Sequence, residues 1–535
     1  MERTDCLIVG AGPVGLATAC LLRHHGIDCR LVEKLEAPSV LTKAAGIWSR
    51  TTEVLDSMGL AQRFIEAGNL AHGGNIFGEG RRLVHLDLTA VDSPFNFLLM
   101  LPQHETELLL VEHLEQLGGK VERGLALTSL QQDAEGVDCG LGDTQIRASY
   151  VVGCDGAHST VRKQLALPFE GRPEDDMWMV GDVTIHGPLP EDEIFVYLAE
   201  EGTMALFPLG DHRYRVAAIA GPDHDPDSQS PSPEIFEGAI LKRGPAGLNV
   251  SGAENLWYFR IHERQVPHYR VGRVFLAGDA AHIHSPMGGQ GMNTGIQDAF
   301  NLAWKLAMVV RGQAGERLLD SYHLERHPVA EKVIRGTTWG THAMTLKSTV
   351  GQHIRNRVMG LVSKLPLFQS RVPRVAAEID IHYRQSPLSL EPHALPHGWL
   401  FNGGVASGNR APNAVVFRGS DHQPVSLFEL LREPHFQLLL LSGISPGPDY
   451  GRLKAIAQWV GSHHADLITP HIVCAHPDAP TDLPGLLHDP QHDLHHQHAA
   501  AQESLVLIRP DGHVAHRSQP ADLDALQRYL QLVLH

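Results

Sequence analysis

Three glycines near the amino terminus have the spacing of a phosphate-binding turn. Gly10, Gly12 and Gly15 follow an apolar run and precede residues with the apolar spacing of a helix. In such a turn the first glycine permits a tight bend, the second lets a pyrophosphate approach the backbone, and the third allows close helix packing. The amino-terminal end of the helix also favours negative charge. Glu33 ends the next strand-like run, eighteen residues after Gly15, where a carboxylate can bind ribose hydroxyls.

This pattern predicts a dinucleotide site, and a glycine-rich turn without a ligand is the alternative. The expected contacts are Gly10, Gly12, Pro13, Val14, Gly15, Glu33 and Lys34. The sequence contains one such fingerprint, whereas an enzyme with two independently seated dinucleotides usually contains two. The bound cofactor is therefore either a nicotinamide dinucleotide that binds and dissociates in each turnover or a flavin that remains bound.

A second glycine-rich loop follows Asp279. The segment RVFLAGDAAHIHSPMGGQGMN, residues 273–293, indicates a strand, a Gly-Asp pair at its end, and a loop that opens a long amphipathic helix. The arrangement leaves a carboxylate at the end of a strand and presents bare backbone amides to a neighbouring group. It therefore has the features of a second cofactor contact.

A third motif, CDGAHSTVR at residues 154–162, again places Asp-Gly between a strand and a helix start. Read together and in this order, the three motifs resemble the class A flavoprotein monooxygenases, the aromatic hydroxylases of the p-hydroxybenzoate hydroxylase fold. The similarity extends over nearly the whole chain. The resemblance implies that Asp279 binds the ribityl chain of FAD and that the loop up to Asn293 faces the pyrimidine edge of the flavin. The loop contacts expected from it are Pro286, Gly289, Gly291, Met292 and Asn293.

Further contacts follow from the same resemblance. Asp155 and Gly156 match a motif that serves both FAD and NADPH, and Arg162 would fix that loop or attract pyridine-nucleotide phosphates. A surface ion pair on a helix is the alternative for Arg162. Gln103, in LPQHETELL, would touch FAD, and Lys43 stands where relatives usually have arginine. Lysine keeps the positive charge of arginine but lacks its planar guanidinium group, so the cofactor contact of Lys43 is the least secure of the predicted set.

The resemblance implies an FAD-dependent, NAD(P)H-using monooxygenase. It would hydroxylate a phenolic or polyketide-like aromatic with dioxygen, through a flavin C4a-hydroperoxide. Oxidative inactivation of an antibiotic by the same chemistry, or a non-catalytic flavin-binding protein, are the alternatives. No catalytic side chain is assigned. His284 either faces the substrate or, like His282, has a structural role.

The elements that must position these residues indicate an α/β protein. The predicted organisation is a Rossmann-like FAD-binding domain at 1–175, an antiparallel substrate-binding sheet at 176–265, and the return of the first domain with a helical connector at 266–394. Residues 395–535 resemble the thioredoxin-like domain of phenol and polyketide hydroxylases, without a CxxC pair. Cys474 is the only cysteine after Cys154, which leaves a structural role or a contact in a homodimer.

Aromatic side chains of the middle segment are candidates for the pocket wall, and half or more of them are expected to be ordinary sheet packing. They are Trp178, Tyr197, Phe207, Tyr214 and Tyr258. The histidine-rich segment 488–498 has no apolar periodicity, and we expect a solvated loop there.

Composition narrows the class of partner. The 535 residues exceed the size of one domain, and the net charge of −17 with dispersed basic residues argues against nucleic acid and anionic membranes. Six scattered cysteines favour neither a disulfide framework nor a metal site. Without a signal-peptide pattern or a run long enough to cross a bilayer, the expectation is a cytoplasmic enzyme with a small aromatic substrate.

Overall fold

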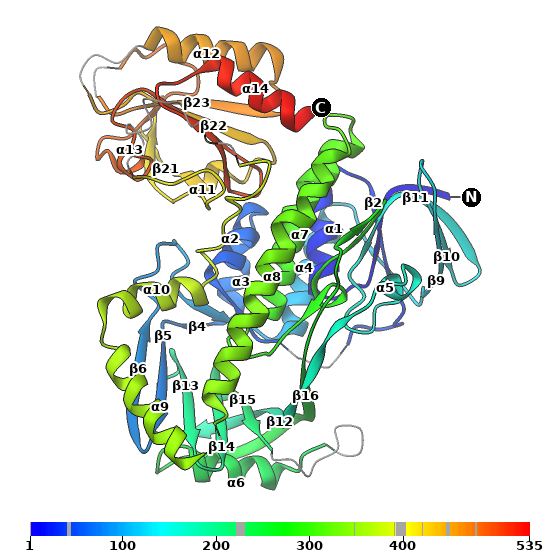
Figure 1. Ribbon diagram of the computed structural model, residues 1–535, viewed down its shortest axis with the longest axis vertical. Helices are drawn as coiled ribbons and strands as arrows, with labels where there is room; N and C mark the ends of the chain where they lie inside the picture. The colour runs from blue at the N-terminus through cyan, green and yellow to red at the C-terminus, as the bar shows by residue number, and fades with distance from the viewer. Residues whose placement is uncertain are drawn as a thin grey trace.

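The computed structural model describes residues 2–39, 44–220, 230–346, 348–389, 391, 403–419, 421–445, 450–476 and 479–535. The described part of the chain forms two large sheets, a small three-stranded sheet, and a separate carboxyl-terminal sheet (Figure 1). No helix in these ranges is long and apolar enough to span a bilayer.

The first sheet is built on parallel strands in the order β18, β11, β1, β2, β8. Their bounds are Val274–Leu276, Thr144–Gly153, Glu2–Val9, Cys29–Glu33 and Val121–Arg123. Strands β9 (Leu127–Gln132), β10 (Val137–Leu141) and β17 (Arg270–Val271) extend it in antiparallel pairs. Because the central strands are parallel, their carboxyl ends meet at one edge, which is where ligands bind in such sheets.

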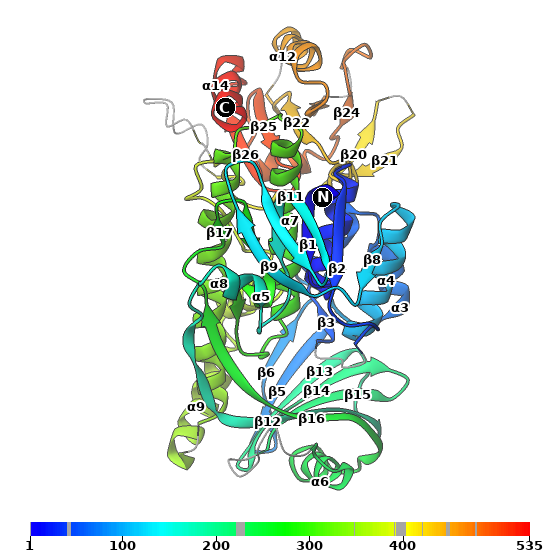
Figure 2. The same cartoon turned by 90° about the vertical axis from the view of Figure 1, so that its right-hand side faces the viewer.

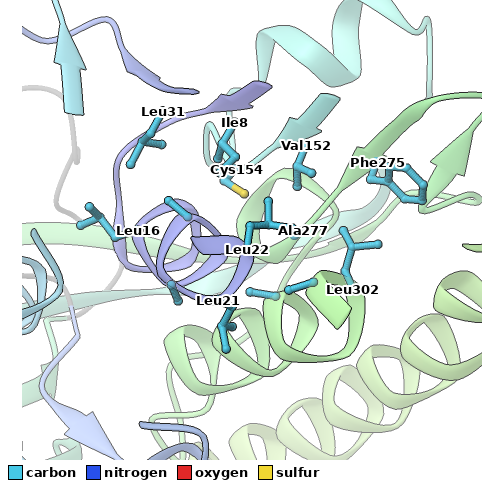
Figure 3. Close-up of a cluster of buried hydrophobic side chains, with 14 of the residues drawn as sticks. Ile8, Leu16, Leu21, Leu22, Leu31, Val152, Cys154, Phe275, Ala277 and Leu302 are labelled. Atoms are coloured by element: carbon cyan, nitrogen blue, oxygen red, sulfur yellow. The ribbon is translucent and has the colours of Figure 1, made fainter. Parts of the chain in front are cut away.

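Two helices pack on this sheet, α1 (Pro13–His24) and α7 (Gly291–Val310). Figure 3 shows the apolar contact between them and the strands. The side chains in view include Ile8, Leu16, Leu21, Leu22, Leu31, Val152, Phe275 and Leu302. Both faces of α1 are covered, since α4 (Gln103–Gln116) also contacts it. This packing holds the loops that precede α1 and α7 in place at the carboxyl edge of the sheet.

The second sheet has the order β19, β16, β12, β15, β14, β13, β5, β6. Its strands span His282–Ile283, Asn249–Gln265, Glu170–His186, Arg213–Ile219, Gly202–Gly210, Glu193–Ala199, Gly73–Gly78 and Arg81–Asp87. Figure 2 shows α6 (Pro233–Arg243) beneath it, on the side away from the first sheet. The sequence prediction of 176–265 for this sheet did not include β5 and β6. Strand β5 pairs with β13, which lies more than a hundred residues later, and local sequence patterns do not show which distant strands pair.

The remaining elements connect these sheets. Strands β3 (Gly46–Ile47), β4 (Asn69–Ala71) and β7 (Leu98–Met100) form the small sheet beside helices α2 (Ser49–Ser57) and α3 (Ala61–Ala67). The short helices are α5 (Thr160–Gln164) and the 3-10 turn η1 (Gly278–Ala280). The long connector consists of α8 (Arg317–Met344), α9 (Thr349–Val362) and α10 (Pro366–Ala376).

The carboxyl-terminal sheet has the order β21, β20, β24, β23, β22, β25, β26. These strands span Pro424–Ser426, Val415–Arg418, Leu487–His488, Ile468–Cys474, Phe436–Leu441, Ser504–Ile508 and Val514–Ser518. The helices are α11 (Leu427–Leu430), α12 (Tyr450–His463), α13 (Asp493–Gln497) and α14 (Leu523–Leu534). Strands β22 and β23 are parallel, and β25 and β26 are antiparallel to their neighbours.

The expectation of a solvated loop at 488–498 is wrong. His495 and His498 are buried, and α13 lies within the segment. Asp489 accepts hydrogen bonds from the backbone N–H and from Nδ1 of His495, the latter at 2.7 Å. Polar pairing of this kind allows burial without an apolar period, so the sequence pattern gave no sign of it. Among the described residues, no group of histidine, cysteine and carboxylate side chains is arranged to hold a metal.

Candidate active site

One cavity of about 1530 Å³ lies between the carboxyl edge of the first sheet and a face of the second. It is lined by loops that follow β1, β2, β11 and β18, together with side chains of the second sheet. The sequence-predicted residues that line it are Gly10, Gly12, Pro13, Val14, Glu33, Lys34, Gln103, Asp155, Gly156, Asp279, Pro286, Gly289, Gly291 and Met292. Segments more than two hundred residues apart in sequence therefore converge on one space.

The three glycines of the first turn meet different surroundings. A Cβ on Gly10, whose φ is +103°, would lie 2.5 Å from the carbonyl oxygen of Cys154, and one on Gly15 would lie 1.8 Å from that of Gly10. A Cβ on Gly12 would meet nothing within 4 Å among the described atoms. Helix α1 begins here with Pro13 at its start and without a side-chain cap, so its first N–H groups are open to an acceptor.

Glu33 lies beside this turn. Its carboxylate accepts hydrogen bonds from the backbone N–H groups of Ala11, at 2.8 Å, and Leu35, at 3.0 Å. The two bonds hold the side chain at the end of β2, facing the cavity next to Lys34. Gln103 stands at the start of α4, where its Oε1 accepts from the N–H of Ala44 at 3.2 Å. These contacts orient the polar groups before any ligand is present.

The second loop is fastened by Asn293 and Trp48. Asn293 Oδ1 accepts from the N–H of Trp48 at 2.9 Å, and its Nδ2 donates to the carbonyls of Gly46 and Gly289. The Trp48 indole donates to the carbonyl of Gly288 at 2.6 Å. Asn293 is buried behind the loop and does not line the cavity, so it positions the glycines. Trp48 was not recognised from sequence, because its partner lies 240 residues away.

The Asp-Gly motif is fastened in a similar way. The carboxylate of Asp155 accepts from Ser159 Oγ at 2.5 Å and from the N–H of Thr160 at 2.6 Å, which caps α5. Arg162 is buried, and its guanidinium donates to the carbonyls of Ala157 and Ala280. The surface ion pair considered for Arg162 is therefore wrong. The arginine ties this loop to the Asp279 loop and does not line the cavity.

Gly15 and Lys43 are two further predicted cofactor contacts. Gly15 lies under the turn, where its role is close packing against Gly10, and it does not reach the cavity. Lys43 lies outside the described residues. Asp279, by contrast, is exposed and lines the cavity from η1 at the end of β18, as the sequence motif predicted.

The second sheet supplies an aromatic wall. Of the five aromatic residues considered from sequence, Trp178 and Phe207 line the cavity, whereas Tyr197 and Tyr214 pack in the core on the other side of the sheet. Tyr258 borders the cavity but belongs to that same core cluster. The neighbouring Trp257 and Phe259 also line the cavity. Alternation along a strand decides which side each residue takes, and the register was needed to know it.

A buried ion pair interrupts this apolar wall. Arg215 on β15 donates from Nε to Asp182 Oδ1 at 2.8 Å and from Nη2 to Oδ2 at 2.9 Å. Its Nη1 donates to the carbonyl of Ala44 at 3.2 Å. Asp182, on β12, provides the counter-charge that burial of a guanidinium requires. Arg215 lines the cavity and was not singled out from sequence.

His282 and His284 have different environments. His282 is buried, 2.7 Å from Asp298 Oδ2 through its Nε2. His284 lines the cavity, and its Nδ1 lies 2.8 Å from the carbonyl oxygen of Ser285, which makes Nδ1 the protonated nitrogen. Burial lowers the pKa of His284 to about 4, so the ring is neutral at physiological pH. Its buried Nε2 has no hydrogen-bond partner among the described residues.

Glu378 also borders the cavity and carried no sequence signal. It follows α10 and accepts hydrogen bonds from Thr294 Oγ1 at 3.1 Å and Gln297 Nε2 at 2.6 Å, both on the first turns of α7. Burial raises the pKa of Glu378 to about 7, although the charge of Arg326 opposes that rise. A carboxyl group that titrates near neutrality therefore lies beside the glycine loop.

These features fit FAD. The open position at Gly12 leaves room where a pyrophosphate must approach the backbone, and the uncapped start of α1 supplies donors and positive potential for it. Glu33 offers carboxylate oxygens at the end of β2, and Asp279 offers another near the start of α7. The donor set and the volume suit an elongated dinucleotide better than a small ion.

Comparisons with known proteins agree with this geometry. The family model described as FAD binding domain matches residues 3–337, and that described as Aromatic-ring hydroxylase, C-terminal matches residues 405–534. Rifampicin monooxygenase of Streptomyces venezuelae is 42% identical over 340 residues, covering 62% of this chain and 70% of that protein. An uncharacterised aromatic compound monooxygenase of Bacillus subtilis is 32% identical over 522 residues, covering 96% of this chain and 94% of that protein.

A solved structure shares the whole architecture. It is a ternary complex of aklavinone-11 hydroxylase with FAD and aklavinone, with a TM-score of 0.78, 25% identity, and coverage of 100% of this chain and 99% of that one. The matched motifs, the cradle at the carboxyl edge of the first sheet and the aromatic wall opposite it lead to one conclusion: the chain belongs to the FAD-dependent aromatic-ring monooxygenases, the class A flavoprotein hydroxylases.

Proposed function

We propose that this monooxygenase uses NAD(P)H and dioxygen to hydroxylate a phenolic or polyketide-like aromatic substrate. The observation that carries the proposal is the continuity of the cavity, which joins the FAD loops to a wall containing Trp178, Phe207, Trp257 and Phe259. Flat aromatic faces favour stacking with fused rings. At about 1530 Å³ the cavity exceeds the volume usual for one drug-sized ligand, which suits a cofactor and a multi-ring substrate together.

The roles of the side chains follow from their places. When bound and reduced by NAD(P)H, FAD would activate dioxygen and supply one of its oxygen atoms to an electron-rich ring, the other leaving as water. The turn at Gly12, with Glu33 and Asp279, would hold the cofactor, and the amides from Gly289 to Gly291 would face its pyrimidine edge. Arg215 places a guanidinium group, whose charge Asp182 balances, on the aromatic wall, where it would orient a polar group of the substrate.

His284 is the polar group best placed to interact with a proton on the substrate. Its Nε2 is an acceptor, is buried, and belongs to a ring that remains neutral down to about pH 4. A neutral imidazole can accept a hydrogen bond from a phenol without adding charge to the site. Of the two roles considered from sequence for His284, we therefore favour the one that faces the substrate.

NAD(P)H would bind transiently. The sequence holds a single G-x-G-x-x-G turn, so a second permanent dinucleotide seat has no support. The loop at Asp155 and Gly156 lines the cavity and remains the proposed contact for the nicotinamide cofactor. We expect a correct substrate to accelerate reduction of the flavin, because reduction of an enzyme without substrate wastes the reductant.

The domain roles are part of the proposal. We assign 1–175 and 266–394 to the FAD-binding domain and connector, 176–265 with β5 and β6 to the substrate sheet, and 395–535 to a thioredoxin-like domain without a redox pair. The order β22, α12, β23, β24, α13, β25, β26, α14 supports the last assignment, as does the run β23, β22, β25, β26 within the sheet. This domain would have a structural role or join two subunits of a homodimer.

A second function is favoured by one comparison. Because a rifampicin monooxygenase is 42% identical over 340 residues, oxidative inactivation of a polyketide antibiotic is the alternative reaction. Both reactions use the same cofactor and cavity, and they differ in whether the product retains antibiotic activity.

The experiment uses the FAD-loaded enzyme with NADPH. Flavin reduction is followed by stopped flow with a simple phenol, an anthracyclinone, a tetracyclic naphthacene and rifampicin, and products are analysed after reaction in ¹⁸O₂. We expect a multi-ring phenol to accelerate reduction at least about tenfold and to gain one labelled oxygen atom. Equal reduction rates with and without every compound, and unlabelled products, would contradict the proposed hydroxylation. A growth-inhibition assay of the products separates the two functions.

A further inference from the structure

A large apolar surface is exposed on the helical connector. Of seventeen large hydrophobic side chains that are exposed among the described residues, ten lie between 339 and 375. We call this region the α9–α10 surface. Its exposed apolar members are Trp339, Leu346, Val350, Ile354, Val358, Leu361, Val362, Leu365, Leu367 and Val375. Contiguous exposure of this kind marks a surface that another body covers.

Helix α9 has its apolar side turned outward. Val350, Ile354 and Val358 follow one another at intervals of four residues, which places them on one face of the helix, and Val350 is 70% exposed. The opposite face packs on the second sheet: Asn356, 2% exposed, donates to Glu79 Oε1, Ser363 Oγ donates to the carbonyl of Leu83 on β6, and Met359 packs against the apolar cluster that contains Leu83. The helix is therefore anchored to the second sheet by both polar and apolar contacts of one face, while the apolar stripe Val350, Ile354 and Val358 on the other face is exposed among the described residues.

The same stretch carries only positive charge. Residues 332–377 contain no aspartate or glutamate. They contain eight basic residues, Lys332, Arg335, Lys347, Arg355, Arg357, Lys364, Arg371 and Arg374. Residues 332–377 are therefore positively charged, although the whole chain has a net charge of −17. The earlier expectation that no anionic membrane is involved rested on dispersed basic residues, and the acidic composition of the rest of the chain concealed this segment.

An anionic lipid surface matches both properties. Basic residues around an outward apolar stripe are the features of a helix that lies in the membrane interface, with its apolar face among the acyl chains and its cations among the headgroups. Trp339, 76% exposed on α8, is a residue type that favours this interface. A second copy of the chain fits less well, because a two-fold contact would bring the same positive surface of each subunit together.

We propose that the α9–α10 surface docks the enzyme on anionic membranes. Figure 1 shows α9 and α10 on the outer flank of the lower half of the molecule, beside β5 and β6, away from the carboxyl-terminal sheet. The exposed basic residues of its own elements are Lys332, Arg335, Arg357, Lys364 and Arg371. The acidic groups at its border are Glu331, which pairs with Arg335, Glu79, which lies beside His353, and Asp380, which pairs with Arg374.

The surface also borders the cavity. Gly336 and Gly340 on α8 and Val375 and Ala376 on α10 line the cavity, and Val375 belongs to the exposed surface as well. An apolar aromatic compound dissolved in the bilayer can therefore pass to the active site over apolar side chains. This second part of the inference rests on the proposed function, whereas membrane docking does not.

The test is co-sedimentation of the FAD-loaded enzyme with vesicles. Phosphatidylcholine vesicles are compared with vesicles that also contain phosphatidylglycerol, at low and high salt. We expect at least about tenfold stronger partitioning onto the anionic vesicles, with most of the difference lost at high salt. The double variant I354E/L361E should lower partitioning by about tenfold or more, because it places two negative charges on the apolar stripe. Neither residue lines the cavity, so FAD content and turnover of a soluble substrate should be unchanged.

A matched control is Leu241→Glu. Leu241 is an exposed leucine on α6, also packed on the second sheet but outside the α9–α10 surface, and its replacement should leave vesicle binding at the wild-type level. Failure of the wild-type enzyme to bind anionic vesicles would overturn the proposal. So would equal binding by I354E/L361E and wild type. A homodimer in sedimentation velocity that the double variant dissociates would assign the surface to a second copy instead. None of these outcomes depends on which substrate the enzyme hydroxylates.

Discussion

Gly12 and Gly15 belong to one turn, yet a side chain at each would meet opposite surroundings. A Cβ at Gly12 points into open space, and one at Gly15 would overlap the carbonyl oxygen of Gly10 at 1.8 Å. We expect Gly12→Val to fold with an unchanged circular dichroism spectrum but to bind FAD at least about tenfold more weakly, since the side chain occupies the pyrophosphate position. Gly15→Val should fail to fold. FAD titration by fluorescence checks both, and wild-type FAD affinity in Gly12→Val would contradict the assignment.

Glu378 makes the stability depend on pH near neutrality. Burial raises its pKa to about 7 from an ordinary 4.5. The groups that face it are Thr294, Gln297 and Asp298 on α7 and Arg326 on α8. Because the folded pKa is the higher one, the stabilising effect of the protonated form is complete below about pH 4.5 and is lost as the pH rises through 7. The loss amounts to about 3 kcal/mol.

Replacement by glutamine should remove this dependence. Glu378→Gln should gain stability relative to wild type between pH 5 and pH 8, by about 2 to 3 kcal/mol, since the amide does not ionise. Urea unfolding at both pH values measures the change. The exposed Glu331→Gln is the matched control and should show no such trend. A difference between Glu378→Gln and wild type that is the same at both pH values would show that Glu378 does not titrate in this range.

At the scale of an element, the start of α7 has to present backbone amides without filling the cavity. A Cβ on Gly291 would have His284 Nε2, at 3.9 Å, as its nearest neighbour, so the fold leaves room for a larger residue. Gly291→Val should therefore fold and bind FAD. Its branched side chain would occupy the cavity beside the cofactor, and we expect the ratio of product to NADPH consumed to fall several-fold while hydrogen peroxide rises.

A glycine on the helix of the second sheet provides the comparison. Gly238 lies within α6, outside the cavity, and no atom of the described residues is within 4 Å of its Cβ position. Gly238→Val should keep full coupling, because only the helix propensity changes there. A peroxide assay on both variants distinguishes occupation of the site from a general effect of valine. Full coupling in Gly291→Val would remove the positioning role of the loop.

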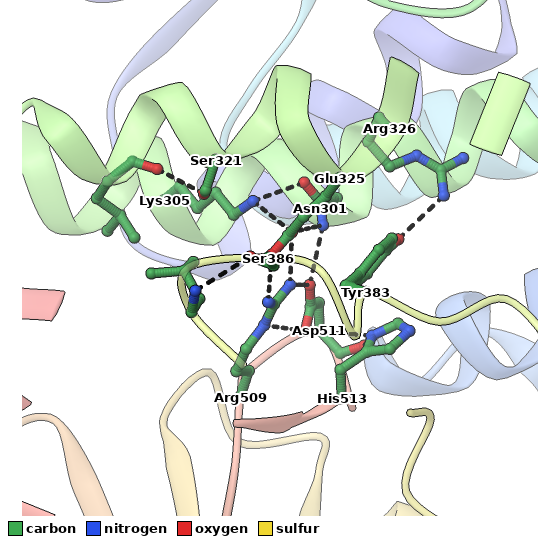
Figure 4. Close-up of polar contacts among 12 residues, drawn as sticks. Asn301, Lys305, Ser321, Glu325, Arg326, Tyr383, Ser386, Arg509, Asp511 and His513 are labelled. Carbon is green, nitrogen blue, oxygen red and sulfur yellow. Dashed lines mark hydrogen bonds and ion pairs between the residues drawn. The ribbon is translucent and has the colours of Figure 1, made fainter. Parts of the chain in front are cut away.

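At the scale of the whole molecule, a buried ionic network joins α7 and α8 to the carboxyl-terminal domain (Figure 4). Glu325 on α8 accepts from Lys305 Nζ at 2.7 Å and from Arg509 Nη1 at 2.6 Å, and Arg509 also pairs with Asp511. All four groups are buried, and two positive charges meet two negative ones. Despite burial, the neighbouring cations hold the pKa of Glu325 well below its usual range.

Removal of one charge should therefore be costly. Glu325→Gln leaves Lys305 and Arg509 buried with Asp511 as the one remaining carboxylate of the four, and we expect a loss of about 3 to 5 kcal/mol in unfolding free energy. Glu331→Gln breaks an exposed pair with Arg335 and should cost no more than about 1 kcal/mol. Chemical denaturation measures both. Similar small losses in the two variants would mean that the domain contact does not depend on this network.

The carboxyl-terminal domain should perform no thiol chemistry. Cys474 is buried in its core, and burial raises the pKa of its thiol to about 11, so little thiolate exists at neutral pH. We expect Cys474→Ser to keep the turnover per bound FAD, with at most a modest loss of stability. Turnover and FAD content measured on the same preparation check this. Lost turnover at full FAD content would contradict the structural role.

Local sequence was sufficient for the cofactor loops. The glycine spacing at Gly10 to Gly15, Glu33 eighteen residues later and the Gly-Asp pair at Asp279 are short-range patterns, because a turn between a strand and a helix constrains only the residues within it. Parallel strands then bring their carboxyl ends together, so the convergence of these loops was expected from the Rossmann-like domain that the sequence predicted. Fourteen of the predicted contacts line one cavity for this reason.

Tertiary structure decided everything that depends on pairing between distant segments. The register of β12, β15 and β16 selects Trp178 and Trp257 for the cavity and places Tyr214 in the core, and a shift of one residue would exchange those faces. Arg215, Glu378 and Trp48 owe their roles to partners on other elements, and the apolar stripe of α9 is exposed because the face with Asn356 and Met359 is the one that packs on the second sheet. Sequence patterns record a residue's own period and neighbours, whereas burial depends on what the rest of the chain places against it.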